Sequence, residues 1–134
     1  MKNLFDLTGK VALVTGASSR LGIQFAKALA NQGADIAICA RRVEKLEEVK
    51  KEIEALGVKC YSHKCDVLNI EEIRQMVKDI EEYYGKIDIL VNNAGVGDVA
   101  PAEGMNDETW RKVLGTNLDA VFYCAREVGN VMIK

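Results

Sequence analysis

The sequence predicts an α/β fold, in which a doubly wound parallel sheet of about four strands carries helices on both faces. Short apolar runs alternate with longer charged stretches in which apolar residues recur every three or four positions. This alternation is typical of strand–helix units joined by right-handed crossovers. No linker, repeat or low-complexity segment interrupts the pattern over 134 residues. We therefore expect a single domain over residues 1–134.

The first strand is expected at residues 10–15 (KVALVT), a short apolar run that suits a buried parallel strand. A helix over 21–32 follows and ends at Gly33, because glycine favours the left-handed position after a last helical turn. Residues 34–40 (ADIAICA) are the second expected strand.

The next helix is predicted over 43–56 and ends at Gly57. Its apolar residues form one stripe of helical spacing, made of Leu46, Val49, Ile53 and Leu56. Residues 58–65 alternate in character and are expected as the third strand.

A third helix, a fourth strand and a long final helix complete the pattern. Asn69 and Glu72 offer a capping box for the third helix, which ends at Gly85. Residues 87–91 (IDILV) are the fourth expected strand. After a loop that holds the only proline, Asn106 caps a long helix that runs on to the C-terminus.

The turn after the first strand is the first candidate site, because doubly wound sheets bind ligands at the carboxyl ends of their strands. Small residues let the backbone approach a pyrophosphate, and the N–H groups and positive dipole end of the next helix attract it. The pattern GxGxxG is absent, so a tight turn without a ligand stays the alternative. The residues concerned are Gly16, Ser18, Ser19, Arg20, Leu21 and Gly22.

Two arginines, Arg41 and Arg42, follow the second strand. An acidic residue at this position would hold the ribose 2′-hydroxyl of NAD, and no acid is present. Guanidinium groups combine charge with bidentate geometry and suit the 2′-phosphate of NADP. The alternative is that both arginines are solvated and pair with Glu44 or Glu47 on the next helix.

The third and fourth strand ends complete the candidate site. Asp66 and Val67 follow the third strand, where the carboxylate can accept a hydrogen bond from an adenine amine beside the valine. A plain helix-entry turn would have the same residues. Asn93, Ala94 and Gly95 follow the fourth strand, where side-chain amides can bridge neighbouring strands and glycine admits a ribose.

These motifs resemble the short-chain dehydrogenase/reductase family, and most of all its gluconate 5-dehydrogenase-like and 3-oxoacyl-reductase-like members. The match covers TGASSRLG at 15–22, CDV at 65–67, NNAG at 92–95 and TNL at 116–118. It implies a Rossmann-type fold and hydride transfer between NAD(P)(H) and an alcohol or ketone, with a sugar acid as one candidate substrate. By this resemblance the four strand ends bind the cofactor and Arg41 favours NADP(H), while NAD(H) stays an alternative.

Two departures from the family pattern bear on function. Arg20 stands where TGxxxGxG has its middle glycine, so it either crowds the diphosphate or adds a phosphate contact. The family's catalytic group is an Asn, a Ser and a Tyr followed four residues later by Lys, and only Asn117 matches. None of the four tyrosines has a lysine four residues on. The resemblance therefore implies an N-terminal half that is inactive by itself, because Tyr and Lys supply the proton transfer.

Two alternatives remain beside this oxidoreductase half: a nucleotide-binding module without activity, and a truncated fragment that associates with itself. A homo-oligomer is expected through the helix from about residue 107 or through the uncovered fourth strand.

Composition limits the partners and the compartment. A net charge of −2 gives no reason to expect nucleic acid, and no apolar run is long enough for a membrane helix. The four cysteines do not resemble a disulfide framework, so a reducing cytoplasm is expected. His63 lies between Cys60 and Cys65 without a recognised zinc spacing, and no metal site is expected.

Overall fold

The computed structural model describes residues 1–134 and contains the four-stranded parallel sheet that the sequence predicts. The strand order is β3–β2–β1–β4, so the topological switch point lies between β1 and β4. Each strand lies inside its predicted range. The strands are β1 (Val11–Thr15), β2 (Asp35–Ala40), β3 (Cys60–Lys64) and β4 (Ile89–Val91).

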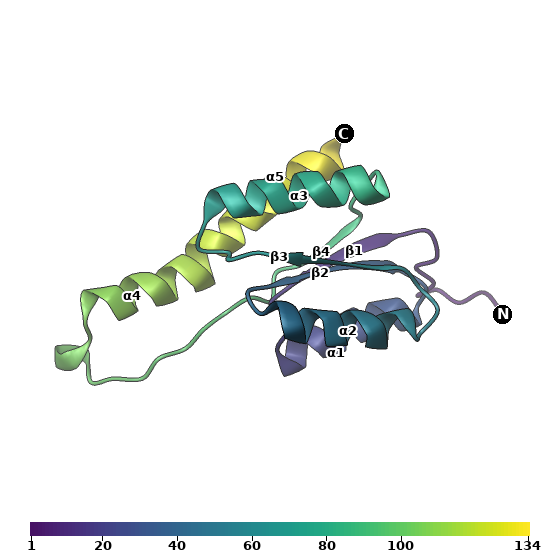
Figure 1. The fold of residues 1–134 in the computed structure, drawn as a ribbon. Helices are drawn as coiled ribbons and strands as arrows, with labels where there is room; N and C mark the ends of the chain where they lie inside the picture. The colour runs from purple at the N-terminus through teal and green to yellow at the C-terminus, as the bar shows by residue number, and fades with distance from the viewer.

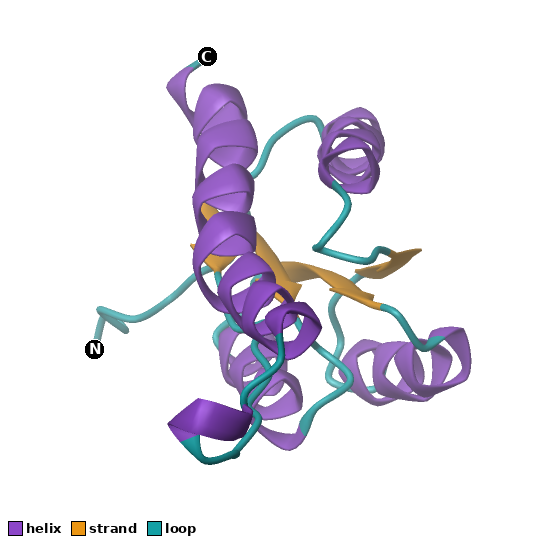
Figure 2. Ribbon diagram, turned by 90° about the vertical axis from the view of Figure 1, so that its left-hand side faces the viewer, coloured by secondary structure: helices purple, strands orange, loops and turns teal.

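Helices cover both faces of the sheet. They are α1 (Arg20–Asn31), α2 (Val43–Glu54), α3 (Ile70–Tyr84), α4 (Asp107–Leu114) and α5 (Ala120–Ile133). Figures 1 and 2 show α1 and α2 on one face and α3 and α5 on the other. Strand side chains alternate between the two cores: Ala12 and Val14 pack with α1 and α2, and Leu13 packs with α3 and α5. The predicted fold class is confirmed.

The start of α3 differs by one hydrogen bond from the predicted capping box. Asn69 Oδ1 accepts from the backbone N–H groups of Glu71 and Glu72, at 3.0 and 3.3 Å. The Glu72 carboxylate does not return to Asn69 but accepts from the Asp66 N–H at 3.2 Å. The reason is that the Asn69 N–H already donates to the Asp66 carbonyl at 3.0 Å. The box is therefore only half formed.

The predicted long C-terminal helix is present from Asp107 to Ile133, but it contains a π turn that the sequence did not predict. A 3-10 turn at Ala102–Gly104 precedes α4, and a π-helical turn over Gly115–Asp119 separates α4 from α5. Apolar periodicity does not reveal a π turn, since one extra residue shifts the phase without ending the helix. Asn106 does cap α4, and its Oδ1 accepts from the Thr109 N–H at 2.7 Å. Figure 1 shows α4 projecting beyond the sheet.

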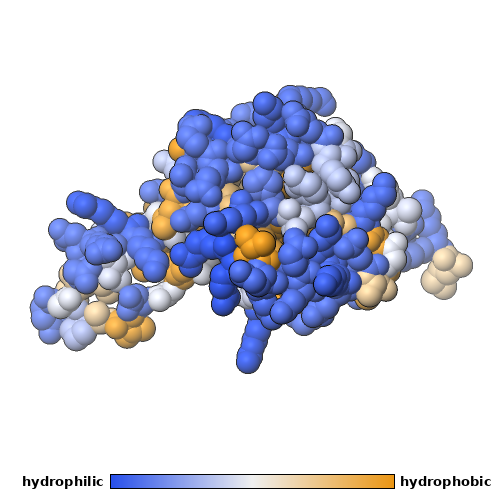
Figure 3. Space-filling view, viewed as in Figure 1, coloured by the Kyte–Doolittle hydropathy of each residue, from blue (hydrophilic) through white to orange (hydrophobic).

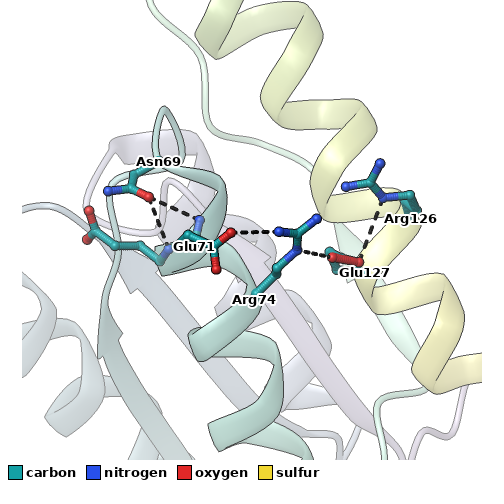
Figure 4. A network of polar contacts seen from close by, with 6 residues as sticks. Asn69, Glu71, Arg74, Arg126 and Glu127 are labelled. Carbon is teal, nitrogen blue, oxygen red and sulfur yellow. Dashed lines mark hydrogen bonds and ion pairs between the residues drawn. The ribbon is translucent and has the colours of Figure 1, made fainter.

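Ion pairs join α3 to α5 (Figure 4). Arg74 on α3 donates to Glu127 on α5 at 2.8 Å and to Glu71 at 2.6 Å. The Glu127 side chain is only 16% exposed, so this pair is screened less than one on open surface. On the inner face of α5, Cys124 and Val128 are buried in the core between the sheet and α3. These contacts hold α5, and with it the π turn, in place.

The surface over α2 and α3 is mostly hydrophilic (Figure 3). On α2 the apolar stripe is buried at Leu46, Val49 and Ile53, while most of the charged residues are exposed. Large apolar side chains are exposed instead along the helical segment from α4 to α5. No helix of the structure has both the length and the apolar character needed to span a membrane.

Candidate functional site

A cleft of about 400 Å³ lies at the carboxyl ends of the strands. All four strand-end turns contribute to it, because parallel strands end at one edge of the sheet. The predicted residues that line it are Gly16, Ser18, Ser19, Arg41, Arg42, Asp66, Val67, Asn93, Ala94 and Gly95. The predicted residues outside its lining are Arg20, Leu21, Gly22 and Asn117.

Two glycines let the first turn approach the last one. Gly16 has a φ of +62°, and a Cβ there would lie 2.8 Å from the Ala94 Cα. A Cβ on Gly22 would lie 2.6 Å from Asn93 Nδ2 and would collide with the Gly16 carbonyl oxygen. Gly22 therefore allows the start of α1 to pack on the strand ends, a close approach that only glycine permits.

Asn93 and Thr15 join the ends of β4 and β1. Thr15 is buried, and its Oγ1 accepts from the backbone N–H groups of Asn93 and Ala94, both at 3.0 Å. Asn93 Nδ2 donates to the carbonyl oxygens of Thr15 and Gly16, both at 3.1 Å. The prediction that an amide bridges neighbouring strands is confirmed. A direct contact between Asn93 and a cofactor stays a prediction.

The N-terminus of α1 has no side-chain cap. Ser19 precedes the helix, but its Oγ donates to the Gly16 carbonyl at 2.9 Å instead of accepting from the helix. The backbone N–H groups of Arg20, Leu21 and Gly22 therefore have no acceptor within the chain. Uncapped N–H groups at a positive dipole end attract anions, and no acidic side chain lies in this first turn.

Arg20 occupies the position of the family's middle glycine without backbone strain. It is the first residue of α1, and every residue with a positive φ in this chain is a glycine. Crowding that depends on a positive φ therefore does not arise. Arg20 is exposed and outside the cleft lining, so the added phosphate contact stays a prediction.

Arg41 and Arg42 line the cleft and are exposed. Neither guanidinium group forms an ion pair with a carboxylate of the chain. Glu47, one of the two partners that the sequence offered, accepts instead from the Ser62 hydroxyl at 2.8 Å. Both guanidinium groups are consequently available to an anion in the cleft.

The turn after β3 presents a carboxylate beside two thiols. Asp66 and Val67 line the cleft, and Asp66 Oδ1 accepts from the Leu68 N–H at 3.0 Å. Cys39 and Cys65 also line it, and both are buried. A hydrogen bond with Cys65, together with burial, raises the pKa of the Cys39 thiol well above its usual value. The Cys39 thiol is therefore a neutral part of the lining.

Asn117 lies on the π turn and holds the loop that follows Gly95. Its Oδ1 accepts from the Val96 N–H at 2.9 Å, and its Nδ2 donates to the Val96 carbonyl at 2.7 Å. The neighbouring Thr116 is buried and lines the cleft, as Val96 does. The predicted catalytic residue is thus adjacent to the cleft lining, with its amide bound to the loop.

None of the four tyrosines lines the cleft. Tyr84 donates its hydroxyl to the Ile36 carbonyl at 2.8 Å, and burial raises its pKa. Tyr61 and Tyr83 contact each other, with ring centroids 4.6 Å apart. Tyr123 packs against the core between the sheet and α3 and α5. No tyrosine is therefore placed to exchange a proton with a ligand in the cleft.

His63 contacts a carboxylate. Its Nε2 lies 2.9 Å from Asp79 Oδ2, and its Nδ1 lies 2.7 Å from the Lys64 carbonyl oxygen. Cys60 packs into the core under α1 and α2, and Cys65 packs into the opposite core, as strand alternation predicts.

Some residues of the lining were not predicted from the sequence. They are Cys39, Ala40, Cys65, Leu68, Val96 and Thr116. Cys65 and Thr116 belong to the motifs CDV and TNL, and Ala40, Leu68 and Val96 are each next to a predicted residue. Cys39 alone had no such signal in the sequence. Cys39 reaches the cleft because its side chain alternates to the same face as Cys65.

The family model described as short chain dehydrogenase matches residues 10–134. The gluconate 5-dehydrogenase of Gluconobacter oxydans (strain 621H) is 39% identical over 131 residues, which cover 98% of this chain and 51% of that relative. A 3-oxoacyl-(acyl-carrier-protein) reductase of Staphylococcus epidermidis is 36% identical over 126 residues, which cover 93% and 52%. The chain therefore spans about half the length of the curated relatives it matches.

Solved structures match the fold over almost the whole chain. A metagenomic short-chain oxidoreductase in complex with NADP has a TM-score of 0.90 at 38% identity, over 95% of this chain and 58% of that one. An NAD+-bound xylitol dehydrogenase has a TM-score of 0.92 at 35% identity, over 95% and 49%. The family match and these likenesses confirm the resemblance seen in the strand-end motifs, and the chain belongs to the short-chain dehydrogenase family.

Proposed function

We propose that residues 1–134 form a single nucleotide-binding domain, the cofactor-binding half of an NADP-preferring oxidoreductase. The main support for this cofactor preference is that Arg41 and Arg42 line the cleft and form no ion pair with the chain. No acidic residue stands at this end of the second strand. A 2′-phosphate matches that charge, whereas the 2′-hydroxyl of NAD calls for an acidic acceptor.

The donor groups of the cleft fit a phosphorylated dinucleotide. Ser18 and the uncapped N-terminus of α1 would hold the pyrophosphate. Ser19 would join them by turning its hydroxyl from the Gly16 carbonyl to the phosphate. Asp66 Oδ2 has no partner in the chain and would accept from the adenine amine beside Val67. Gly95, in the turn after β4, is exposed and lines the cleft, and a ribose would approach the backbone there. The bound nicotinamide would supply or accept the hydride.

The reaction proposed for the whole protein is the oxidation of a secondary alcohol or the reduction of a ketone. A sugar acid is the first substrate class to test, because a gluconate 5-dehydrogenase is among the relatives. Asn117 is the one member of the family's catalytic group in the chain. We infer that these 134 residues bind the cofactor without turnover, because no tyrosine with a following lysine is present to move the proton.

Calorimetric titration of the purified chain with NADPH and with NADH tests the cofactor assignment. NADPH is expected to bind more tightly than NADH. Arg41→Ala should lower the affinity for NADPH by roughly 10- to 100-fold, the worth of hydrogen bonds to a charged group, and should leave the affinity for NADH unchanged. Arg111→Ala is the matched control, because Arg111 is exposed on α4 and outside the cleft. Equal affinity for NADH would contradict the role of Arg41.

An assay of NADPH turnover with a panel of ketones tests the second part of the proposal. We expect binding without turnover by the pure chain. Turnover at a rate that scales with the concentration of pure chain would show that the Tyr and Lys are not required.

We also propose that the chain associates with itself through the helical segment from residue 107. Trp110, Leu114, Leu118 and Phe122 follow one another at four-residue spacing and are 59%, 37%, 62% and 58% exposed. Farther along the same segment, Cys124 and Val128 are buried and belong to the core. A row of large apolar side chains in water favours a second copy as its cover. The unpaired edge of β4 is the other candidate surface.

The four cysteines are free and buried. A reducing cytoplasm is the compartment proposed for such a chain.

A further inference from the structure

We propose that Glu72 is a positioning residue for the adenine end of the cleft. Its carboxylate holds the turn at Asp66 in the shape that offers one free oxygen to the exocyclic amine of adenine. This role rests on the proposed function, since it requires that an adenine nucleotide binds in the cleft.

Glu72 is the third residue of α3, the position from which a capping-box carboxylate bonds the residue before the helix. That donor, the Asn69 N–H, is already bonded to the Asp66 carbonyl at 3.0 Å. Glu72 Oε1 reaches past it and accepts from the Asp66 N–H at 3.2 Å. The carboxylate therefore stabilises the turn that lines the cleft as well as the helix start.

Asp66 is held at three of its four polar groups. Its N–H donates to Glu72, its carbonyl accepts from Asn69, and its Oδ1 accepts from the Leu68 N–H at 3.0 Å. Its Oδ2 accepts no hydrogen bond from the chain, and Asp66 lines the cleft. The turn thus presents one unoccupied acceptor in a fixed direction, which is what recognition of a single amine requires.

The neighbouring Glu71 provides a contrast on the same helical turn. Its carboxylate accepts from Arg74 at 2.6 Å, and Figure 4 shows it turned toward that guanidinium group and the α3–α5 contact. Glu71 therefore has the same charge as Glu72 and lies in the same first helical turn, but it makes no bond to the Asp66 turn.

Loss of the Glu72 acceptor would leave the half-buried Asp66 N–H without a partner. The turn would then be free to rotate, and the Asp66 carboxylate would lose its direction. Glu72→Gln keeps an oxygen acceptor at the same distance and should preserve the turn. Glu72→Asp keeps the charge at the helix N-terminus but is one methylene too short to reach the Asp66 N–H.

The test compares NADPH with its hypoxanthine analogue, in which a carbonyl oxygen replaces the adenine amine. Calorimetry on the purified chain should give about a tenfold preference for NADPH, the worth of one hydrogen bond to a charged group. Glu72→Ala and Glu72→Asp should reduce that preference to less than about threefold. Asp66→Asn should reverse it, because the amide nitrogen would face the cleft and donate to the hypoxanthine carbonyl. Glu72→Gln and the control Glu71→Ala should retain it.

The preference between the two nucleotides separates positioning from general stabilisation, because a variant that only weakens the fold lowers both affinities together. Glu72→Asp keeps the assay decisive if Glu72→Ala fails to fold. A wild-type chain that binds neither nucleotide contradicts the proposed function. A wild-type preference that survives in Glu72→Asp overturns the role of Glu72 while leaving the proposed function intact.

Discussion

Asn93 is predicted to matter for the stability of the chain before any ligand is present. Its Nδ2 donates to the carbonyl oxygens of Thr15 and Gly16, both at 3.1 Å, and so joins the end of β4 to the end of β1. Both partners are acceptors, which requires the nitrogen of the amide to face them. The perturbation is Asn93→Ala, which removes both donors and leaves the backbone bonds to Thr15 Oγ1 and Val91 available.

The expected magnitude follows from counting the bonds that are lost. A hydrogen bond within a folded chain contributes about 1 kcal/mol net, so Asn93→Ala should lower the free energy of unfolding by about 2 kcal/mol. Asn92→Ala is the matched control, because Asn92 Nδ2 makes one bond, to the Val121 carbonyl at 3.1 Å. Its expected effect is about 1 kcal/mol. A loss of about 2 kcal/mol is a large part of the stability of a small domain.

Urea denaturation followed by circular dichroism measures both variants without any nucleotide, and linear extrapolation returns the two free energies. The midpoint of Asn93→Ala should fall further than that of Asn92→Ala, with an unchanged slope. An Asn93→Ala variant as stable as the wild type would refute this reasoning, because the residue would then act on a ligand only.

Two further predictions concern acid sensitivity and association. Hydrogen bonds from His63, the larger effect, and from Gln75 lower the pKa of Asp79 below its ordinary value of 3.8. The ionised Asp79 therefore stabilises the fold above pH 3.8, and this stabilisation is lost as the pH falls through the lower pKa of the folded state. The free energy of unfolding, measured with urea between about pH 5 and pH 2, should therefore depend less on pH in Asp79→Asn than in the wild type. The control Asp98→Asn should show the pH dependence of the wild type. The same pH dependence in all three proteins would contradict this role of Asp79. Phe122→Glu should shift the chain toward the monomer in light scattering after gel filtration, because it places a charge in the exposed apolar row of α4 and α5. Gln24→Glu, exposed on α1, is the control, and a monomeric wild type would contradict the association.

The four strand ends show why so much of the candidate site was predictable. Parallel strands connected by helices must end at one edge, so Gly16, Arg41, Asp66 and Asn93 converge without any knowledge of their side-chain contacts. The end of the first helix was equally predictable, since Gly33 takes a φ of +100° where a left-handed residue was expected. These features follow from local periodicity and from backbone freedom, both of which are properties of short segments.

The π turn, the partner of Glu72 and the free state of Arg41 were not predictable in the same way. Each depends on which acceptor or donor comes within about 3 Å once distant segments are packed, and a sequence offers several partners for each polar group. The sequence predicts that Glu72 accepts from the Asn69 N–H. In the structure Glu72 accepts from the Asp66 N–H instead, because the Asn69 N–H donates to the Asp66 carbonyl.

By itself, the sequence determined the order of strands and helices, the edge of the sheet that holds the cleft, and the family to which the motifs belong. Only the tertiary structure decided which carbonyl oxygens Asn93 bonds, that Asn117 bonds the loop at Val96, and that Asp66 keeps one oxygen free. The physical reason is that periodicity places apolar faces over many residues, whereas a hydrogen bond is decided by a few tenths of an ångström between two atoms.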